Sequence, residues 1–260
     1  MSTGTHPRTG RTAPPPAPAG RGARRGRFVP PQHGAWAMLL VPYLAGLLVA
    51  GAVWAHVPLL VAWIGGYLLS YYVFLALKSR RPGRYRAQLV LYSVVTLPPA
   101  ALLLAIRPAL LWYAPAYAVL LAINALSAWR RRERTLLNDL AAVAQSCLMV
   151  GVVATVAGVS LHAVTGAFLA CALYFAGTAF FVKTMIRERS NPVYYRWSLA
   201  YHVAAFAASL PLGPAMAAFF AWTALRAGAL PRRRLAPLQV GLIEIANSVV
   251  LLVLVGLTLR

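Results

Sequence analysis

Long apolar segments separated by short polar loops run through the chain from about residue 35 to its C-terminal end. Many approach the roughly 20 consecutive apolar residues that an α-helix needs to cross the hydrocarbon core of a bilayer. Nine can be distinguished, at about residues 35–54, 57–77, 88–106, 109–129, 136–158, 161–182, 195–210, 212–230 and 238–259. The pattern therefore predicts an all-α, polytopic membrane protein with about nine transmembrane helices.

The first 32 residues differ in character from the rest of the chain. They are rich in proline, glycine and arginine and contain Pro14-Pro15-Pro16. Such a segment has too few apolar residues to build a core. We expect residues 1–32 to be a disordered basic tail and residues 33–260 to form a single helical transmembrane domain.

Composition agrees with a membrane location and bears on the partners. Hydrophobic residues make up 60% of the chain and charged residues only 11%, whereas soluble domains carry about 25% charged residues. The net charge of +21 would suggest nucleic acid in a soluble protein. Here the basic residues lie in short clusters between apolar segments, so the expected partners are anionic membrane lipids and not nucleic acid.

The distribution of basic residues predicts the orientation. Of the 25 Lys and Arg residues, 23 fall in the tail, in or beside the loops that follow the second, fourth and sixth predicted helices, or at the end of the eighth helix and in the loop after it. Only Arg107 and Arg260 fall on the other side. Because cytoplasmic loops carry the excess of Lys and Arg, we expect a bacterial inner-membrane protein with its N-terminus in the cytoplasm and its C-terminus outside.

The four acidic residues are informative because they are so few. Glu133 lies among arginines, which indicates a local ion pair. Asp139 follows Asn138 one turn into the fifth helix and either pairs with nearby arginines or faces the bundle interior. Glu244 lies nearly two turns into the ninth helix and shares a face with Asn247. The two residues are candidates for either a functional site or a polar clasp between helices.

The loop after the sixth helix is the densest polar segment of the chain. It contains Lys183, Arg187, Glu188 and Arg189. Lys183 and Arg187 are four residues apart and share one side of a continuing helix. Two fixed cations there suit a phosphate or carboxylate headgroup, although ordinary topogenic charge is the alternative interpretation.

Three aromatic candidates remain. His202 in the seventh helix is either a hydrogen-bonded packing residue or a ligand. His33 precedes Gly34 where the chain enters the membrane, and Trp36 is either part of that site or an interfacial anchor. The sequence shows no glycine loop for nucleotides, no metal-ligand cluster and no catalytic triad, so neither a metal nor a cofactor is predicted.

Several of these segments together resemble the YwiC-like family of bacterial membrane proteins. The resemblance is carried by Pro31-Gln32-His33-Gly34-Ala35-Trp36 with Pro42 and Gly46, by residues 183–189, by Tyr201-His202, and by Gly241-Leu242-Ile243-Glu244. It covers about residues 30–260. It implies a membrane protein without a defined activity.

The chain also resembles, more distantly, the UbiA-type prenyltransferases. Those enzymes have nine helices and functional cytoplasmic loops after helices two and six, where Asp-rich motifs hold magnesium against a prenyl diphosphate. In this chain the first of these loops, residues 78–84, has no acid, and the second has only Glu188. The resemblance implies that the two loops meet, which would bring Arg80 or Arg81 beside Lys183 and Arg187 in one basic pocket.

The function that we expect is binding of a lipophilic anion, such as an isoprenoid or a lipid headgroup, at the cytoplasmic face. A UbiA-like transferase that lacks the Asp-rich motifs is the first alternative. A small-solute transporter is the second, with Glu244, Asn247 and His202 as its polar path through the membrane.

Overall fold

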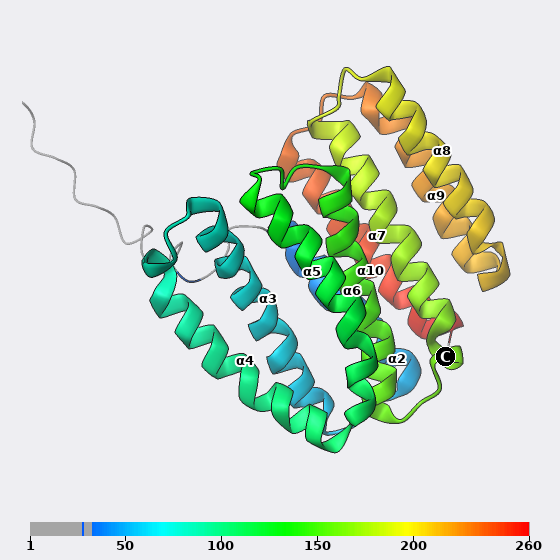
Figure 1. Cartoon of the computed structure of the whole chain (residues 1–260). Helices are drawn as coiled ribbons and strands as arrows, with labels where there is room; N and C mark the ends of the chain where they lie inside the picture. The colour runs from blue at the N-terminus through cyan, green and yellow to red at the C-terminus, as the bar shows by residue number, and fades with distance from the viewer. Residues whose placement is uncertain (1–27, 29–32, 260) are drawn as a thin grey trace, which may run out of the picture. The chain divides into compact units, whose positions relative to one another are not determined.

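Nine α-helices account for most of the chain in the computed structural model, which describes residue 28 and residues 33–259 (Figure 1). They are α2 (His33–Ala50), α3 (His56–Ser79), α4 (Arg86–Ile106), α5 (Ala114–Trp129), α6 (Leu136–Ala157), α7 (Thr165–Ile186), α8 (Pro192–Ser209), α9 (Pro214–Ala229) and α10 (Pro237–Thr258). Short 3-10 turns link several of them. No strand occurs in the described residues. The all-α prediction is confirmed, and each predicted segment coincides with one helix.

The predicted tail lies outside the described residues except for Phe28. The helices belong to a separate unit, Gln32–Arg260. The side chain of His33, one of the candidate site residues, is likewise outside the described part.

Six of the helical segments are long and apolar enough to cross a membrane. They correspond to α3, α4, α5, α6, α7 and α10. The remaining three are shorter or more polar, and α9, with 16 residues, would extend only about 24 Å at 1.5 Å per residue. Several apolar helices in one chain indicate a multi-pass membrane protein, while membrane crossing by α2, α8 and α9 stays a prediction.

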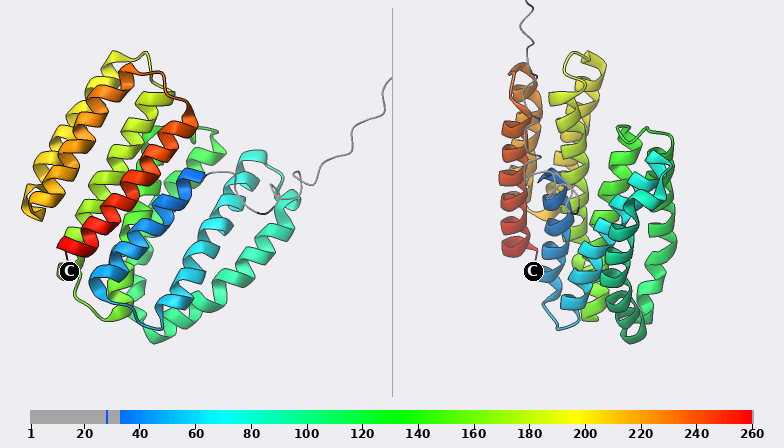
Figure 2. Two further views of the ribbon diagram at one scale, coloured as in Figure 1. Left: turned by 180° about the vertical axis from the view of Figure 1, so that it is seen from behind. Right: turned by 90° about the vertical axis from the view of Figure 1, so that its left-hand side faces the viewer.

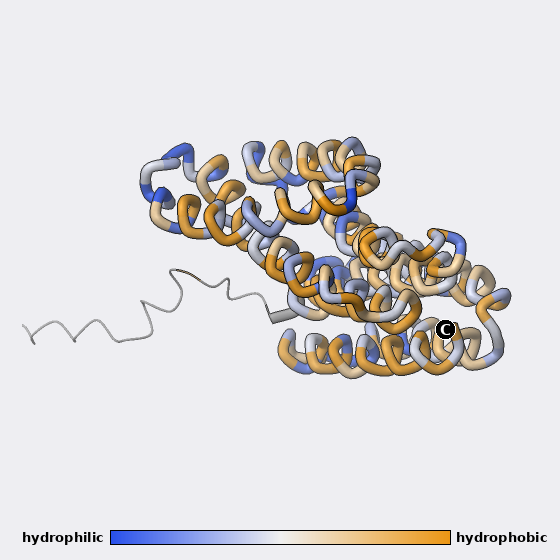
Figure 3. The backbone as a smooth tube through the Cα atoms, turned by 90° about the horizontal axis from the view of Figure 1, so that it is seen from below, coloured by the Kyte–Doolittle hydropathy of each residue, from blue (hydrophilic) through white to orange (hydrophobic). Residues whose placement is uncertain are grey.

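The outer surface of the helical unit supports a lipid environment. Large apolar side chains such as Val94, Leu225 and Leu257 are 65%, 69% and 76% exposed. Figure 3 shows hydrophobic residues along the helices and hydrophilic residues chiefly at the turns. Exposed tryptophans lie near both ends of the helices, with Trp54 and Trp112 at one end and Trp129 and Trp197 at the other. Tryptophan is enriched at both interfaces of a membrane.

Helices α6 and α7 lie at the centre of the packing. Helix α6 packs against α2, α5 and α7, and α7 also contacts α8 and α10. Helices α3 and α4 pair on one side of this centre, and α8 and α9 pair on the other (Figures 1 and 2). The apolar window of α6 is 56% buried and that of α4 only 11%. Helix α6 is therefore buried mainly by other helices, whereas most of α4 lies on the surface of the helical unit.

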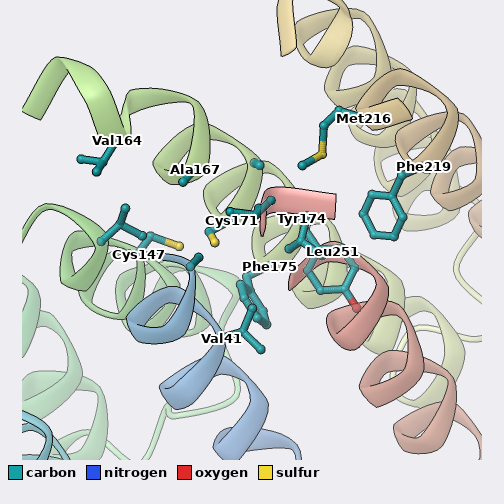
Figure 4. Close-up of a cluster of buried hydrophobic side chains, with 14 of the residues drawn as sticks. Val41, Cys147, Val164, Ala167, Cys171, Tyr174, Phe175, Met216, Phe219 and Leu251 are labelled. Carbon is teal, nitrogen blue, oxygen red and sulfur yellow. The ribbon is translucent and has the colours of Figure 1, made fainter. Parts of the chain in front are cut away.

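The core between α6, α7, α2, α9 and α10 is made of small, aliphatic and aromatic side chains (Figure 4). Cys147 and Cys171 are both buried there as free thiols. Gly46 of α2 lies so close to α6 that a Cβ atom would approach Val153 Cβ to 2.9 Å. The glycine therefore allows the two helix backbones to pack closely, as small residues do between membrane helices.

Arg107, one of the two basic residues outside the predicted cytoplasmic set, has a structural role. Its Nε donates to Val156 O at 3.2 Å, at the carboxyl end of α6. A cation there stabilises the negative end of the helix dipole and satisfies an unpaired carbonyl. This contact accounts for an arginine on the side where the sequence rule predicts few.

Candidate functional site

The acidic residues all lie in the described part of the chain, and three of the four form ion pairs with described cations. Lys78 Nζ lies 2.8 Å from Glu133, and Lys183 Nζ lies 2.8 Å from Asp139. Arg226 pairs with Glu244. The fourth, Glu188, accepts a hydrogen bond of 2.9 Å from Asn191 Nδ2. These contacts define two polar clusters, one at the start of α6 and one between α7, α9 and α10.

The first cluster forms where α6 begins and α7 ends. Thr135 caps α6 by accepting from Asn138 N at 3.4 Å, and Asp139 in the first turn complements the positive end of the helix dipole. Lys183, in the last turn of α7, complements the opposite end. Its side chain is only 8% exposed, and its ammonium donates to Asp139 and to Arg134 O. Two of its three N–H donors are thus used.

Side-chain amides extend this cluster to α5. Asn124 Nδ2 donates to Asn138 Oδ1 at 2.9 Å, and Gln145 Nε2 donates to Asn124 Oδ1 at 2.7 Å. Asn138 Nδ2 in turn donates to Glu133 O at 2.9 Å. The amides join α5 to α6 directly below the basic loop of residues 130–134.

An apolar groove of about 700 Å³ opens between α5, α6 and α7 beside this cluster. All twelve lining residues are apolar, among them Leu120 of α5, Val143 of α6 and Ala176 of α7. On α6 the groove begins at Leu140, the residue after Asp139. On α7, Ala176 precedes Lys183 by seven residues, or about two turns, so both lie on one face. The groove thus extends along α6 to the residue after Asp139 and along α7 to about two turns before Lys183.

The second cluster surrounds Glu244. Thr178 Oγ1 donates to Glu244 Oε2 at 2.7 Å, and Tyr174 Oη donates to the same oxygen at 3.2 Å. The paired Arg226 side chain is 1% exposed, and its guanidinium lies 4.2 Å from the centre of the Phe181 ring. Asn247 accepts from Trp222 Nε1 at 3.0 Å. Glu244 and Asn247 share a face of α10, as predicted, and both bind residues of α9.

His202 lies on α8 against α7. Its Nδ1 is 2.7 Å from Ser198 O, so this nitrogen carries the proton of the neutral ring and donates it. Its Nε2 packs against Gly177, where an added Cβ would lie 3.2 Å away. The residue is 2% exposed.

The other predicted cations differ from Lys183 in exposure. Arg80, Arg81 and Arg187 are exposed, whereas Lys183 is buried. Helix α3, which ends beside Arg80, packs mainly against α4 and α5, while α7 packs mainly against α6 and α8. Lys183 binds Asp139, and the predicted basic pocket that adds Arg80 or Arg81 stays a prediction. Two further predicted residues make structural contacts.

Arg189 and Trp36, both predicted site residues, make contacts that connect elements of the fold. Arg189 Nε donates to Met185 O and its Nη2 to Leu235 O, both at 2.9 Å, which connects the end of α7 to the segment before α10. Trp36 packs edge-to-face on Tyr67, with 6.0 Å between ring centres.

Sequence reasoning missed Arg226, Thr178, Tyr174, Asn124 and Gln145. Arg226 was counted among the topogenic charges, although it falls inside the predicted helix of residues 212–230. A buried carboxylate such as Glu244 needs a cationic partner. Arg226 was a cation inside a neighbouring predicted helix, and that position could have identified it.

Comparison with known proteins identifies relatives across most of the chain. The YwiC-like protein family model matches residues 29–154. A Bacillus subtilis protein named "Uncharacterized protein YwiC" is 35% identical over 227 residues, which cover 85% of this chain and 93% of that protein. A Haemophilus influenzae protein named "Uncharacterized protein" is 31% identical over 235 residues, which cover 86% and 94%. No solved structure matches. By this identity over nearly their whole length, the chain belongs to the YwiC-like family.

Proposed function

We propose that the protein binds a lipid with an anionic headgroup at its cytoplasmic face. The apolar chain of the lipid occupies the groove between α5, α6 and α7. The headgroup lies at the end of the groove where the Asp139–Lys183 pair is found. This proposal is supported by the apolar groove of about 700 Å³, whose lining on α6 begins at Leu140, next to Asp139 of the Asp139–Lys183 ion pair.

Charge at this end of the groove favours an anion. Arg134, whose carbonyl accepts from Lys183, is exposed, and Arg187 is one turn beyond Lys183 on α7 and also exposed. Asp139 neutralises one of these three cations. The remaining charge is positive, and Lys183 keeps one N–H donor for a headgroup oxygen.

The predicted orientation is part of the proposal. The ends of α3, α5, α7 and α9 and the starts of α4, α6, α8 and α10 carry nearly all the basic residues of the helical unit. The positive-inside rule assigns this side, with the groove end, to the cytoplasm, where anionic lipids are abundant.

Magnesium-dependent prenyl transfer is not part of the proposal. Magnesium needs several oxygen ligands, and three of the four carboxylates are paired with described Lys or Arg side chains. The fourth, Glu188, has no second acid near it in sequence. The residues present therefore do not fit the metal site of that chemistry.

The test compares the lipids that co-purify with charge variants of equal net charge. Arg134→Gln with Arg187→Gln removes two exposed cations beside the groove, and Arg233→Gln with Arg234→Gln removes two exposed cations from the loop before α10. Each lost charge-assisted hydrogen bond costs about 1.5–3 kcal/mol, roughly ten- to a hundredfold in affinity. We expect native mass spectrometry to show loss of bound anionic lipid only in the first variant. Equal lipid retention in both variants would contradict the proposal.

A further inference from the structure

The groove between α5, α6 and α7 extends far from the basic loops. On α7 its lining reaches Phe168, which precedes Lys183 by 15 residues. At a rise of 1.5 Å per residue, Phe168 lies about 22 Å from Lys183 along the helix axis. One leaflet contributes about 15 Å of hydrocarbon, which is half of the roughly 30 Å core of a bilayer. With Lys183 at the membrane surface, the groove on α7 continues past the middle of the bilayer.

The groove runs obliquely across the helices. On α6 the lining begins at Leu140 and ends at Leu148, which is about 14 Å past Asp139 at 1.5 Å per residue. Because Asp139 pairs with the lysine near the end of α7, Leu148 is closer than Phe168 to the basic end of the groove. A ligand that fills the groove therefore starts against α6 and finishes against α7.

The lining is apolar over this whole distance. All twelve lining side chains belong to Ala, Val, Leu, Pro, Phe or Cys, so no hydroxyl, amide or charged side chain lines the groove. Such a lining offers a polar solute nothing to bind and matches a hydrocarbon chain. The volume of about 700 Å³ falls within the range of ligand pockets, about 300–1,000 Å³. The part of a ligand that lies beyond the middle of the membrane is accordingly hydrocarbon.

The two ends of the groove differ in charge. The Lys183 ammonium and the exposed Arg134 and Arg187 belong to the end where α6 begins and α7 ends. On the opposite side of the helical unit the described basic residue is Arg107, and its Nε donates to Val156 O at 3.2 Å. An anionic headgroup is thus attracted to the first end, and its chain extends toward the second.

We propose that the groove holds one hydrocarbon chain of an anionic lipid in an extended conformation, which crosses the middle of the membrane and ends beside Phe168. The inference rests on the proposed function, because that function places the headgroup near Lys183. It adds the class of ligand, a lipid whose chain is at least as long as an octadecyl chain, which spans this distance only when it is fully extended. A shorter chain leaves the apolar surface around Phe168 uncovered by the ligand.

The experiment uses the full chain in phosphatidylcholine nanodiscs and two probes, octadecyl phosphate and decyl phosphate, each with a diazirine at the free end of its chain. Photolysis followed by peptide mass spectrometry locates the adducts. We expect the octadecyl probe to label residues 165–169 at the far end of the groove and the decyl probe to label residues 140–147. Octadecyl adducts confined to residues 140–147 would overturn the chain inference while the proposed function stands. A lack of groove adducts from both probes would overturn the proposed function as well.

Two alanines of α5 provide a matched pair of variants. Both Ala116 and Ala118 are exposed, but only Ala116 lines the groove. Ala116→Phe should lower the yield of far-end octadecyl adducts about tenfold, because a bulky ring in the groove obstructs the chain. Ala118→Phe adds the same ring outside the groove and should leave the yield unchanged. Equal yields from the two variants would also overturn the inference.

Discussion

Glu244 and Arg226 are oppositely charged residues on facing helices, and each depends on the other for its burial. The two side chains are 10% and 1% exposed. Glu244 lies about 10 Å from the start of α10 at Pro237, measured along the helix axis at 1.5 Å per residue. An unpaired charge at such a position is costly, because neither water nor a second counter-ion replaces the missing partner.

Replacing Glu244 by Gln should therefore destabilise the protein by about 3–5 kcal/mol, the cost of breaking a buried pair. The unfolding midpoint of the purified protein measures the effect. Glu188→Gln is the control, since the Glu188 carboxylate accepts a hydrogen bond from the side chain of exposed Asn191, and the substitution should change stability by less than about 0.5 kcal/mol. Equal effects of the two substitutions would show that the Glu244 pair contributes little.

Gly177 is a second position where a change of one side-chain atom should affect stability. An added Cβ would lie 3.2 Å from His202 Nε2 and 3.3 Å from Tyr201 Cε1. Gly177→Ala should destabilise the α7–α8 contact by about 1–3 kcal/mol through overpacking. Gly241→Ala is the control, because nothing lies within 4 Å of its Cβ, and a helix gains slightly from alanine. A neutral Gly177→Ala in thermal unfolding would contradict the close α7–α8 packing.

Candidate residues could be predicted from the sequence where a residue type is rare in its surroundings. Acids inside apolar segments pointed to Asp139 and Glu244, and the structure places polar clusters around both. The partner of Asp139 was not predictable, because which helices are neighbours depends on tertiary packing, whereas Arg226, the partner of Glu244, could have been identified by its position inside an adjacent predicted helix. Lys183 was grouped with Arg187 by helical spacing, but α6 supplies its partner Asp139.

The hydrophobic segments predicted from the sequence correspond closely to the helices of the structure. The sixth predicted segment, 161–182, and α7 differ because Leu161–Val164 is a 3-10 turn capped by Ser160, and the helix then continues to Ile186. Lys183 and Thr184 form part of that extension, since both are buried by neighbouring helices. Hydropathy alone ends a segment at its first charge, whereas packing allows the helix to continue through it.

The N-terminal segment should be dispensable for insertion and folding. Its composition provides no apolar core, and removing residues 2–26 leaves Arg27 and the basic loops to set the orientation. The truncated protein should appear in the membrane fraction at the wild-type level and unfold at the same temperature. Loss of insertion, or a marked fall in the unfolding midpoint, would show that the segment contributes to the folded unit.

At the scale of the whole molecule, nine crossings would place the two termini on opposite sides of the membrane. The basic side predicts a cytoplasmic N-terminus and an external C-terminus. Reporter fusions at both ends, and at residues 210–213 between α8 and α9, should report inside, outside and outside respectively. A C-terminus on the cytoplasmic side would mean that one of the shorter helices, α2, α8 or α9, does not cross.

We propose that the groove between α5, α6 and α7 selects an anionic lipid, and photo-crosslinking from inside the groove tests this directly. A photoreactive amino acid at Ala172, which lines the groove, is compared with one at Val94, an exposed residue of α4. Mass spectrometry then identifies the attached lipids. We expect adducts at Ala172 to be enriched in anionic lipid relative to the bulk membrane, and adducts at Val94 to match the bulk proportion. The same lipid distribution at both positions would contradict the proposal.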